Sequence, residues 1–583
     1  MPVQISSLLD ATHVDRKLRA YAYLTASFQE RGNVHDALDC LTPFVIAALA
    51  QQSGSYLKLE EAAAFVGSLG LRIPVYVLEQ FTSRLVAKNY LTWDNFAKRF
   101  KVSKIDQASF ESGERNDSNI TEAFEALESH LRQFALCKGF EQPPISANWS
   151  DALIHFLKSE QASELIRSID VKGALIGDAL QIETFIVALF IQECEAGKPG
   201  LFTQIVTVFT GILIEDFIGN IQVISDPNTF SRLSIYYDTT VLLRILGTSG
   251  KLLQTATMEM HRTLQDLGCK TYYFDFTEVE TSKVLGALIS AYDLGDNIYN
   301  ETAEAIYNGE LTISEVRDIA VTLSVRLGAL NIFPFIYNTA ARKAEDSFQI
   351  DENRFAETLM SSARVRDRTY KKQNADTDAR SVAIVFRLRR GFVRREVSAS
   401  NHLFVSRNSL LQRVARKFAI EHVDEYDDFA APTVLTVGQI TTIAWISSAK
   451  KLEPRKVSKE LLAACYSAVK PSPGWAEEFS RALARFKVEN PAFTQEKANQ
   501  HFFLQTARSM AKDESLGQAA VLRKINLADI FQDAAEAAGQ REAANQLRIK
   551  ELEERIRELE ASDQRFKNET PKSDAPVQGS FDV

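Results

Sequence analysis

Between residues 230 and 420, short apolar runs alternate with longer segments in which apolar residues recur at helical spacing. Three of the runs have the length of β-strands: Leu233–Tyr237, Lys270–Phe276 and His402–Ser406. Segments with helical periodicity follow or separate them, at Leu252–Leu267, Thr281–Tyr292, Asp376–Arg390 and Ser409–Phe418. Strands that alternate with helices predict a parallel sheet with right-handed crossovers. The pattern therefore predicts an α/β domain embedded in a chain that is otherwise mostly helical.

Changes in pattern along the chain predict its division into domains. Asp226-Pro227-Asn228 breaks the chain before the first strand, and residues 296–375 form a long, mostly helical insertion. We expect an N-terminal helical segment (1–34), a small module (35–105), a helical region (106–228), the α/β domain (229–430), a C-terminal helical region (431–536), a short coiled coil (537–566) and a disordered tail (567–583).

The small module combines three amphipathic helices with a hairpin. The helices are expected at Asp36–Ala50, Lys58–Val66 and Ile73–Lys88, and a hairpin follows them. Three helices and a hairpin resemble a winged helix. Six basic residues could contact phosphates: Arg84, Lys88, Lys98, Arg99, Lys101 and Lys104. Because no base-reading pattern is visible, a protein-binding module remains an equal alternative.

The coiled-coil prediction depends on a short apolar seam. Ile549, Leu552, Ile556 and Leu559 recur at a and d positions, Asp563 interrupts the seam, and Phe566 closes it. The seam offers a route to a homo-oligomer through the C-terminal helix. The tail that follows is polar, which is typical of disorder.

Composition narrows the class of protein. The chain has 583 residues, 45% hydrophobic and 25% charged, with a net charge of −9. This excludes binding of polyanions through bulk charge, so any nucleic-acid surface must be local. The five scattered cysteines predict reduced thiols. We see neither a signal pattern nor a run of 18 apolar residues, and therefore expect a cytoplasmic protein without a membrane partner.

Acidic residues follow the predicted strands at the same edge of the sheet. Asp238 ends the first strand, Glu278 and Glu280 follow the second, and Asp376 and Asp378 begin a later helix. Ligands of open α/β sheets bind at this edge. Helical periodicity favours Asp378, because it shares a stripe with the apolar face of its helix, whereas Asp376 lies about 200° away. The same argument favours Glu280, with Glu278 as the alternative.

Carboxylates that lie close together repel one another unless a cation joins them. Oxygen ligands suit Mg²⁺ or Mn²⁺, and these ions assist phosphodiester hydrolysis. A basic stretch, residues 364–395, is close to Asp378 in sequence and includes Arg380 and Arg387. The sequence therefore predicts a metal site beside a phosphate-binding surface.

Four motifs make the hypothesis more specific. IYYDTTVLLRILG, TEVE, DARSVAIVFRLRRG and FVSRN occur in this order. Over residues 230–420 they resemble the motifs of PIN domains, which have a Rossmann-like parallel sheet and are Mg²⁺- or Mn²⁺-dependent nucleases acting mostly on single-stranded RNA. The resemblance implies Asp238, Glu280 and Asp378 as catalytic metal ligands and Asn408 as a fourth catalytic position.

The resemblance also implies residues that would contact substrate, and its limits leave other functions open. On the resemblance, Thr240, where PIN domains commonly have Asn, and Ser406 would contact substrate, and the basic stretch adds Arg380 and Arg387 as substrate contacts. The large insertion and the helical flanks are not part of a minimal PIN domain. The leading hypothesis is therefore an RNA endonuclease. The alternatives are a non-catalytic PIN-like scaffold or nucleic-acid-binding protein, and a DNA-directed nuclease, for example in phage defence.

Overall fold

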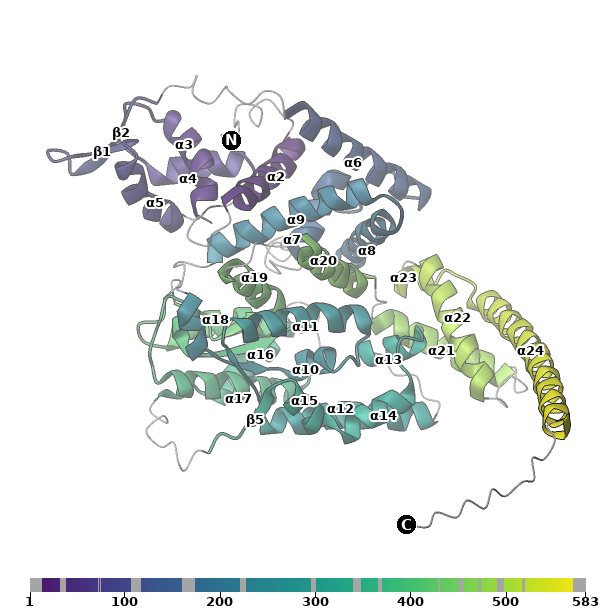
Figure 1. Cartoon of the computed structure of the whole chain (residues 1–583). Coiled ribbons are helices and arrows are strands. Elements are labelled where there is room, and N and C mark those ends of the chain that lie inside the picture. Colours follow the sequence, from purple (N-terminus) through teal and green to yellow (C-terminus); the bar gives the residue numbers. More distant parts are fainter. Residues whose placement is uncertain are drawn as a thin grey trace, which may run out of the picture. The chain divides into compact units, whose positions relative to one another are not determined.

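The computed structural model shows a mostly helical chain that contains a five-stranded parallel sheet and a two-stranded antiparallel hairpin (Figure 1). The chain forms two compact units, residues 1–470 and 471–583. The structure describes residues 13–31, 38–71, 73, 75–105, 117–159, 174–220, 227–294, 300–338, 348–364, 370–427, 430–448, 454–469, 473–489, 497–515 and 519–569. The predicted disordered tail, 567–583, lies almost entirely outside these ranges, as do the first twelve residues of the predicted N-terminal segment.

The parallel sheet confirms an α/β domain within a mostly helical, multidomain chain. Its strands are β3 (Ser234–Tyr237), β4 (Lys270–Phe274), β5 (Ile332–Phe335), β6 (His402–Ser406) and β7 (Val434–Thr436). Their spatial order is β5-β4-β3-β6-β7, and all neighbours are parallel. The chain therefore adds β4 and β5 on one side of β3, then returns to add β6 and β7 on the other. A reversal of this kind leaves a crevice at the carboxyl ends of β3 and β6.

Helices cover both faces of this sheet. The helices of this part of the chain are α10 (Thr239–Ile245), α11 (Lys251–Asp266), α12 (Asp275–Leu294), α13 (Glu301–Tyr307), α14 (Ile313–Val321), α15 (Leu323–Ala329), α16 (Glu352–Arg364), α17 (Lys372–Arg389), α18 (Ser409–His422) and α19 (Val437–Ser447). Successive residues of β3 point to opposite faces. Tyr236 packs in one apolar core with α16, α17 and α18, while the hydroxyl of Tyr237 lies 3.0 Å from Nδ1 of His261 on α11. Because both faces are apolar and covered, polar groups gather at the strand ends.

The observed sheet differs from the predicted one at its two edges. Strand β5 lies inside the segment 296–375 that the pattern predicts as a helical insertion, so this segment contributes an edge strand. Strand β7 lies beyond residue 430, the predicted end of the domain. Strand β7 has only three residues, and Pro334 within β5 argues against a strand in the sequence, although edge strands tolerate proline.

The helical region that precedes the sheet joins it in the same compact unit. It contains α2 (His13–Arg31), α6 (Asp117–Cys137), α7 (Trp149–Ser159), α8 (Ala174–Gly197) and α9 (Pro199–Asn220). Helix α20 (Pro454–Ala468) contacts α8, α9 and α11, so it belongs to this unit although it lies beyond residue 431. By length and composition, Pro199–Ile218 of α9 could span a membrane, but 61% of that stretch is buried against other helices.

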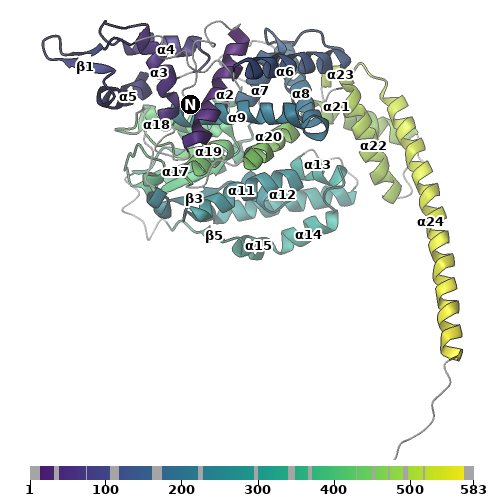
Figure 2. The same cartoon turned by 45° about the horizontal axis from the view of Figure 1, so that its top comes forward.

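The small module has its elements in the predicted order. The helices α3 (Thr42–Ala50), α4 (Leu59–Ser68) and α5 (Val75–Ala87) precede strands β1 (Leu91–Asp94) and β2 (Arg99–Val102). The two strands form an antiparallel hairpin in which Leu91 pairs with Val102. Two views show this hairpin extending away from α3–α5 (Figures 1 and 2).

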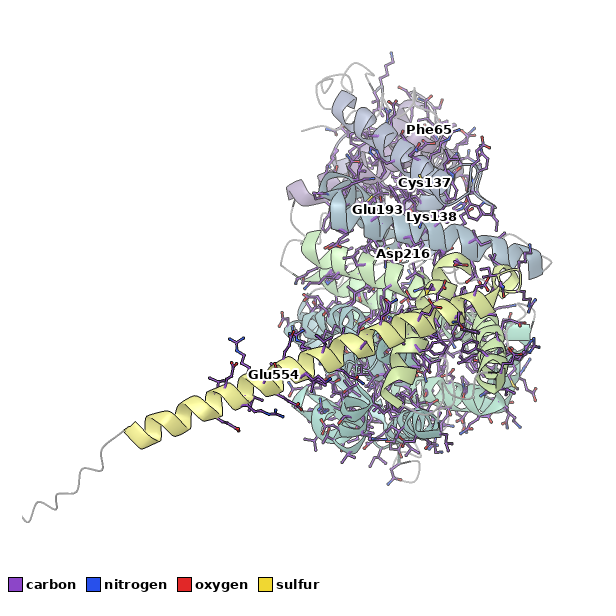
Figure 3. All side chains as sticks on the ribbon, turned by 90° about the vertical axis from the view of Figure 1, so that its right-hand side faces the viewer. Phe65, Cys137, Lys138, Glu193, Asp216 and Glu554 are labelled. Atoms are coloured by element: carbon purple, nitrogen blue, oxygen red, sulfur yellow. The ribbon has the colours of Figure 1, made fainter. Side chains whose placement is uncertain are left out.

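The second unit is entirely helical in its described part. It contains α21 (Pro473–Glu489), α22 (Lys497–Ser515), α23 (Ala519–Leu522) and α24 (Leu527–Glu569). Phe479 packs edge-to-face with Phe531 at a ring distance of 5.4 Å, which joins α21 to the start of α24. The later part of α24, which carries Glu554, is a continuous helix with side chains projecting around it (Figure 3).

Candidate active site

Asp238 lies at the carboxyl end of the central strand, where the chain turns into α10. Its backbone has the extended conformation of an N-cap, but its side chain makes no capping hydrogen bond. The carboxylate instead accepts hydrogen bonds from the Oγ of Ser406 at 2.7 Å and the Oγ1 of Thr240 at 3.0 Å. Asp238 is therefore held in place as an acceptor in the crevice, and it is not the helix cap that a purely structural acid would be.

The neighbouring strand β6 supplies the second wall. Ser406 ends this strand and binds Asp238, and its Oγ also accepts the backbone N–H of Asn408 at 3.1 Å. Asn408 caps α18, because its Oδ1 accepts the backbone N–H groups of Leu410 and Leu411. The predicted fourth position thus has a structural role, and its amide nitrogen points to a further partner described below.

Glu280 reaches the crevice from α12. This helix begins directly after β4, so Glu280 lies in its second turn and does not open it. Its carboxylate accepts a hydrogen bond of 2.6 Å from the Oγ1 of Thr239. Glu278, the alternative, accepts the hydroxyl of Tyr273 at 3.0 Å and does not line the crevice. The structure thus places Glu280, and not Glu278, beside Asp238.

Asp378 reaches the crevice from α17. It lines the same cavity as Asp238 and Glu280, whereas Asp376 is exposed and outside it. The hydroxyl of Tyr370 donates a short hydrogen bond to Asp378 and accepts one of 2.6 Å from the Nδ2 of Asn408. Tyr370 therefore links Asp378 to Asn408, a connection that the sequence motifs do not indicate.

The cavity at this edge has a volume of about 770 Å³. Besides the three acids, Thr240 and Asn408, its lining includes Lys371 of the predicted basic stretch and four residues that the sequence pattern did not indicate: Tyr370, Asn374, Glu301 and Arg407. A signal for Asn374 existed, because Lys371, Asn374 and Asp378 are spaced three and four apart on one helical stripe. Glu301 follows a connection whose course the pattern does not determine, so nothing in the sequence pointed to it.

The predicted basic residues of α17 are engaged elsewhere. Arg380 lies over the ring of Phe276 at 4.4 Å, and Arg387 pairs with Glu352 at 2.9 Å. Neither is among the residues that line the cavity. Arg389 is buried and donates to the carbonyl of His402, fixing the start of β6. Part of the basic stretch, residues 365–369, lies outside the described residues.

Two other cations line the cavity in place of those arginines. Lys371 is exposed at the start of α17. Arg407 pairs with Glu301 at 2.9 Å, and Glu301 also accepts two hydrogen bonds from Arg244. The lining thus combines an acidic centre with cationic groups that could bind phosphate.

Ionisation of the three acids is disfavoured, by burial in each case and by neighbouring carboxylates for Glu280 and Asp378. Burial raises the pKa of Asp238 and of Glu280, against hydrogen bonds that lower it. Burial also raises the pKa of Asp378 well above its ordinary value, and the charges of Asp238 and Glu280 add to this. A cluster of carboxylates that disfavour each other's charge is stabilised by a cation.

The donors present can be compared with the needs of a divalent cation. Mg²⁺ prefers oxygen ligands, and it keeps several waters while binding one or two carboxylates and substrate phosphates. Asp238, Glu280 and Asp378 supply such oxygens to one cavity. In the described part of the chain, no group of three or more His, Cys, Asp or Glu side chains is arranged so that it alone could hold a metal ion. The donor set therefore fits an ion held by few carboxylates, water and phosphate, and does not fit a closed protein cage.

Comparison with models of protein families, with curated proteins and with solved structures finds no match for this chain.

Proposed function

We propose that the α/β domain is a PIN-like endonuclease that hydrolyses phosphodiester bonds in single-stranded RNA with Mg²⁺ or Mn²⁺. One observation carries the proposal. Asp238, Glu280 and Asp378 come from three separate elements and line one cavity, at the point where the strand order of a parallel sheet reverses. Ligand sites of open α/β sheets form at such points, and acids whose pKa is raised there are candidates for function.

In this proposal Asp238, Glu280 and Asp378 would hold the cation, directly or through bound water, as suits an ion that keeps part of its hydration shell. A bound Mg²⁺ or Mn²⁺ makes water a better nucleophile and offsets charge on the phosphate oxygens. Thr239 and Ser406 fix the orientation of the Glu280 and Asp238 carboxylates through the hydrogen bonds described above. Such supporting contacts matter because a carboxylate that rotates no longer presents the same oxygen.

Cationic and steric features support the choice of substrate. Lys371 and Arg407 can bind phosphate beside the acids, as a point charge and as a planar fork respectively. A cavity of about 770 Å³ is of the size that accommodates a small organic molecule. It suits a short segment of a flexible strand better than a duplex. The preference for RNA over DNA comes from the resemblance to PIN domains alone.

Two observations favour the alternative, a PIN-like scaffold without catalysis. The described residues lack a ready metal-ligand group, and the fourth position is the amide Asn408, which caps a helix. A scaffold would bind no Mn²⁺ at this edge. Metal binding therefore separates the two functions.

The experiment is cleavage of labelled single-stranded RNA, matched DNA and duplex with Mn²⁺, together with calorimetric titration of Mn²⁺. The test variant is Asp238→Asn/Asp378→Asn. The matched control is Asp376→Asn/Glu278→Gln, which also removes two acids from these elements but none from the cavity. We expect RNA cleavage and Mn²⁺ binding in the wild type and the control, and neither in the test variant.

Each other outcome contradicts part of the proposal. Cleavage of DNA but not RNA would show a DNA-directed nuclease. Cleavage that persists in the test variant would place the site elsewhere. An absence of both cleavage and Mn²⁺ binding in the wild type would favour the scaffold.

A further inference from the structure

The β1–β2 hairpin exposes large aromatic side chains. Trp93 is 47% exposed and Phe96, in the turn between the strands, is 100% exposed. Leu91 and Val102 at the base of the same hairpin are buried. Trp93 follows Leu91 on the same face of β1, so the apolar face continues beyond the core of the module as exposed aromatic rings.

The tip of this hairpin is held in a defined conformation. The Oδ1 of Asp94 accepts the backbone N–H groups of Phe96 at 2.8 Å and Ala97 at 3.0 Å. Its Oδ2 accepts the hydroxyl of Tyr56 at 2.9 Å. Trp93 packs edge-to-face on Phe100 at a ring distance of 4.8 Å. These contacts therefore fix the conformation of the turn that carries Phe96 and the position of the Trp93 ring.

Basic residues are frequent in the sequence around these rings. Residues 80–104 contain six lysines and arginines and one acid, a net charge of +5 in a chain whose total is −9. Lys88, Lys98, Arg99, Lys101 and Lys104 are exposed. The one acid, Asp94, is occupied by the contacts of the turn. Arg99 and Lys101 lie on either side of Phe100 in β2, so they point to the opposite face from Trp93 and Phe100. The hairpin therefore combines exposed rings on one face with positive charge on the other.

We propose that this hairpin binds single-stranded nucleic acid. Unpaired bases stack on exposed aromatic rings, and lysines and arginines neutralise the phosphates between them. A duplex keeps its bases stacked on one another and offers the rings no free base face. The role of the hairpin in presenting substrate rests on the proposed nuclease function, but binding itself does not require cleavage.

The test measures fluorescence anisotropy of a labelled single strand with the full chain in EDTA, where metal-dependent cleavage is suppressed. We expect Trp93→Ala/Phe96→Ala to weaken binding about 10-fold or more, because stacking on aromatic rings is a major contribution. The matched control is Phe333→Ala, which removes a ring that is 49% exposed on β5; its binding should equal that of the wild type.

A second pair of variants tests the charges. Lys98→Gln/Lys101→Gln should lower the slope of log Kd against log salt by about 1.4, since each phosphate contact in a single strand contributes about 0.7. A merely structural role would not change this slope. Parallel titrations with RNA and DNA identify the preferred strand.

Two results would overturn the proposal: no binding of any single strand, or binding that the aromatic variant leaves unchanged. Loss of cleavage by the Asp238→Asn/Asp378→Asn variant with binding intact separates this surface from the active site. Binding without cleavage in the wild type would contradict the proposed function and leave the hairpin proposal standing.

A separate observation concerns α24, which exposes an apolar stripe. Ile549, Leu552, Ile556 and Leu559 are 54%, 53%, 53% and 63% exposed. Their spacing of three, four and three residues places them on one side of the helix, at a and d positions. Isoleucine at a and leucine at d is the combination that favours parallel two-stranded coiled coils.

The flanking charges match a second copy of the same helix. Arg548 and Arg555 occupy g positions, while Glu553 and Glu560 occupy e positions, and all four are exposed. In a parallel pair each g residue faces the e residue five positions on, so arginine meets glutamate at both levels. In an antiparallel pair g faces g and e faces e, so like charges would meet. Glu554, labelled in Figure 3, is at f and outside the seam.

We infer that residues 548–560 form a parallel homodimeric coiled coil. The test is sedimentation equilibrium of the full chain across micromolar concentrations. Leu552→Glu/Leu559→Glu should yield monomers at concentrations where the wild type is a dimer. Leu547→Glu is the matched control, because Leu547 is 64% exposed but at an f position; it should remain dimeric.

Charge reversal tests the orientation. Arg548→Glu/Arg555→Glu should weaken the dimer at least about 10-fold, and adding Glu553→Arg/Glu560→Arg should restore it. An antiparallel dimer would keep like charges in contact after the first change and would not respond. A monomeric wild type, or a dimer that survives the leucine changes, would overturn the inference.

Discussion

Glu183 is a buried carboxylate and Asp378 a half-buried one, and their surroundings differ. Glu183 of α8 is 2% exposed and accepts hydrogen bonds from the N–H of Ile145 at 3.1 Å, the N–H of Ser146 at 2.8 Å and the Oγ of Ser146 at 2.5 Å. Asp378 instead shares a cavity with Asp238 and Glu280, whose charges raise its pKa. An acid surrounded by donors stabilises a fold, whereas acids that face one another are kept for a ligand.

The largest expected effect is on cleavage. Asp378→Asn should lower Mn²⁺-dependent RNA cleavage by about 10³-fold, roughly 4 kcal/mol, because it removes a proposed cation ligand. Glu183→Gln should leave the specific activity of folded protein unchanged. Single-turnover kinetics measures both. Equal losses of cleavage in Asp378→Asn and Glu183→Gln would show that Asp378 matters no more for cleavage than the structural acid Glu183.

The next largest effect is on stability. Glu183→Gln should lower the free energy of unfolding by about 2 kcal/mol, since an amide cannot accept from all the donors that the carboxylate satisfies. Glu193→Gln on the same helix is the control, because its ion pair with Lys198 is exposed and contributes little. Urea denaturation measures both; equal midpoints would show that Glu183 is not a structural acid.

Tyr370→Phe tests how the cavity holds its acids. Loss of the hydroxyl removes the contacts to Asp378 and Asn408. We expect kcat to fall about 10-fold with KM unchanged, as for groups that orient metal ligands. Tyr466→Phe is the control, since it removes a hydroxyl that contacts Glu310 at 2.8 Å, outside the cavity. An unchanged kcat in Tyr370→Phe would show that Asp378 needs no such support.

Stability should respond to Asp378→Asn in the opposite direction from Glu183→Gln. Without a cation, replacing Asp378 removes a repelled, desolvated charge, so the free energy of unfolding should rise by about 1 kcal/mol. With saturating Mn²⁺ the order should reverse, because the wild type gains binding energy. Thermal melts with EDTA and with Mn²⁺ measure this. A destabilised Asp378→Asn in EDTA would show that Asp378 is structural.

The features that the sequence could predict are those that depend on local pattern. Strands β3, β4 and β6 are apolar runs, and their positions follow from pattern alone. Periodicity also selected Asp378 over Asp376, because packing decides which stripe of α17 faces inward. The edge strand β7 has only three residues, too few for a period to appear.

Long-range contacts account for the rest. Arginine is a residue type that commonly binds phosphate, but Arg387 forms an ion pair with Glu352 on another helix. Tyr370 precedes α17 by a single residue, and only folding brings it to Asn408, 38 positions later in sequence. Contacts between residues that are far apart in sequence leave no local pattern. The periodicity of apolar residues can therefore predict which face of a helix is buried, but not which side chain from another element packs against that face.

The smallest expected effect is a pH dependence beside Glu183. The Oγ of Ser146 lies 3.0 Å from Nδ1 of His155, and burial lowers the pKa of His155, while the charge of Glu183 acts in the opposite direction. Below about pH 6.5 the unfolded chain therefore binds a proton that the folded chain resists. The contribution of His155 to stability is present above that pH and is lost as the pH falls. Melting temperatures between pH 8 and 5 should fall less steeply in His155→Gln and more steeply in Glu183→Gln. If His155→Gln keeps the slope of the wild type, the proton is taken up elsewhere.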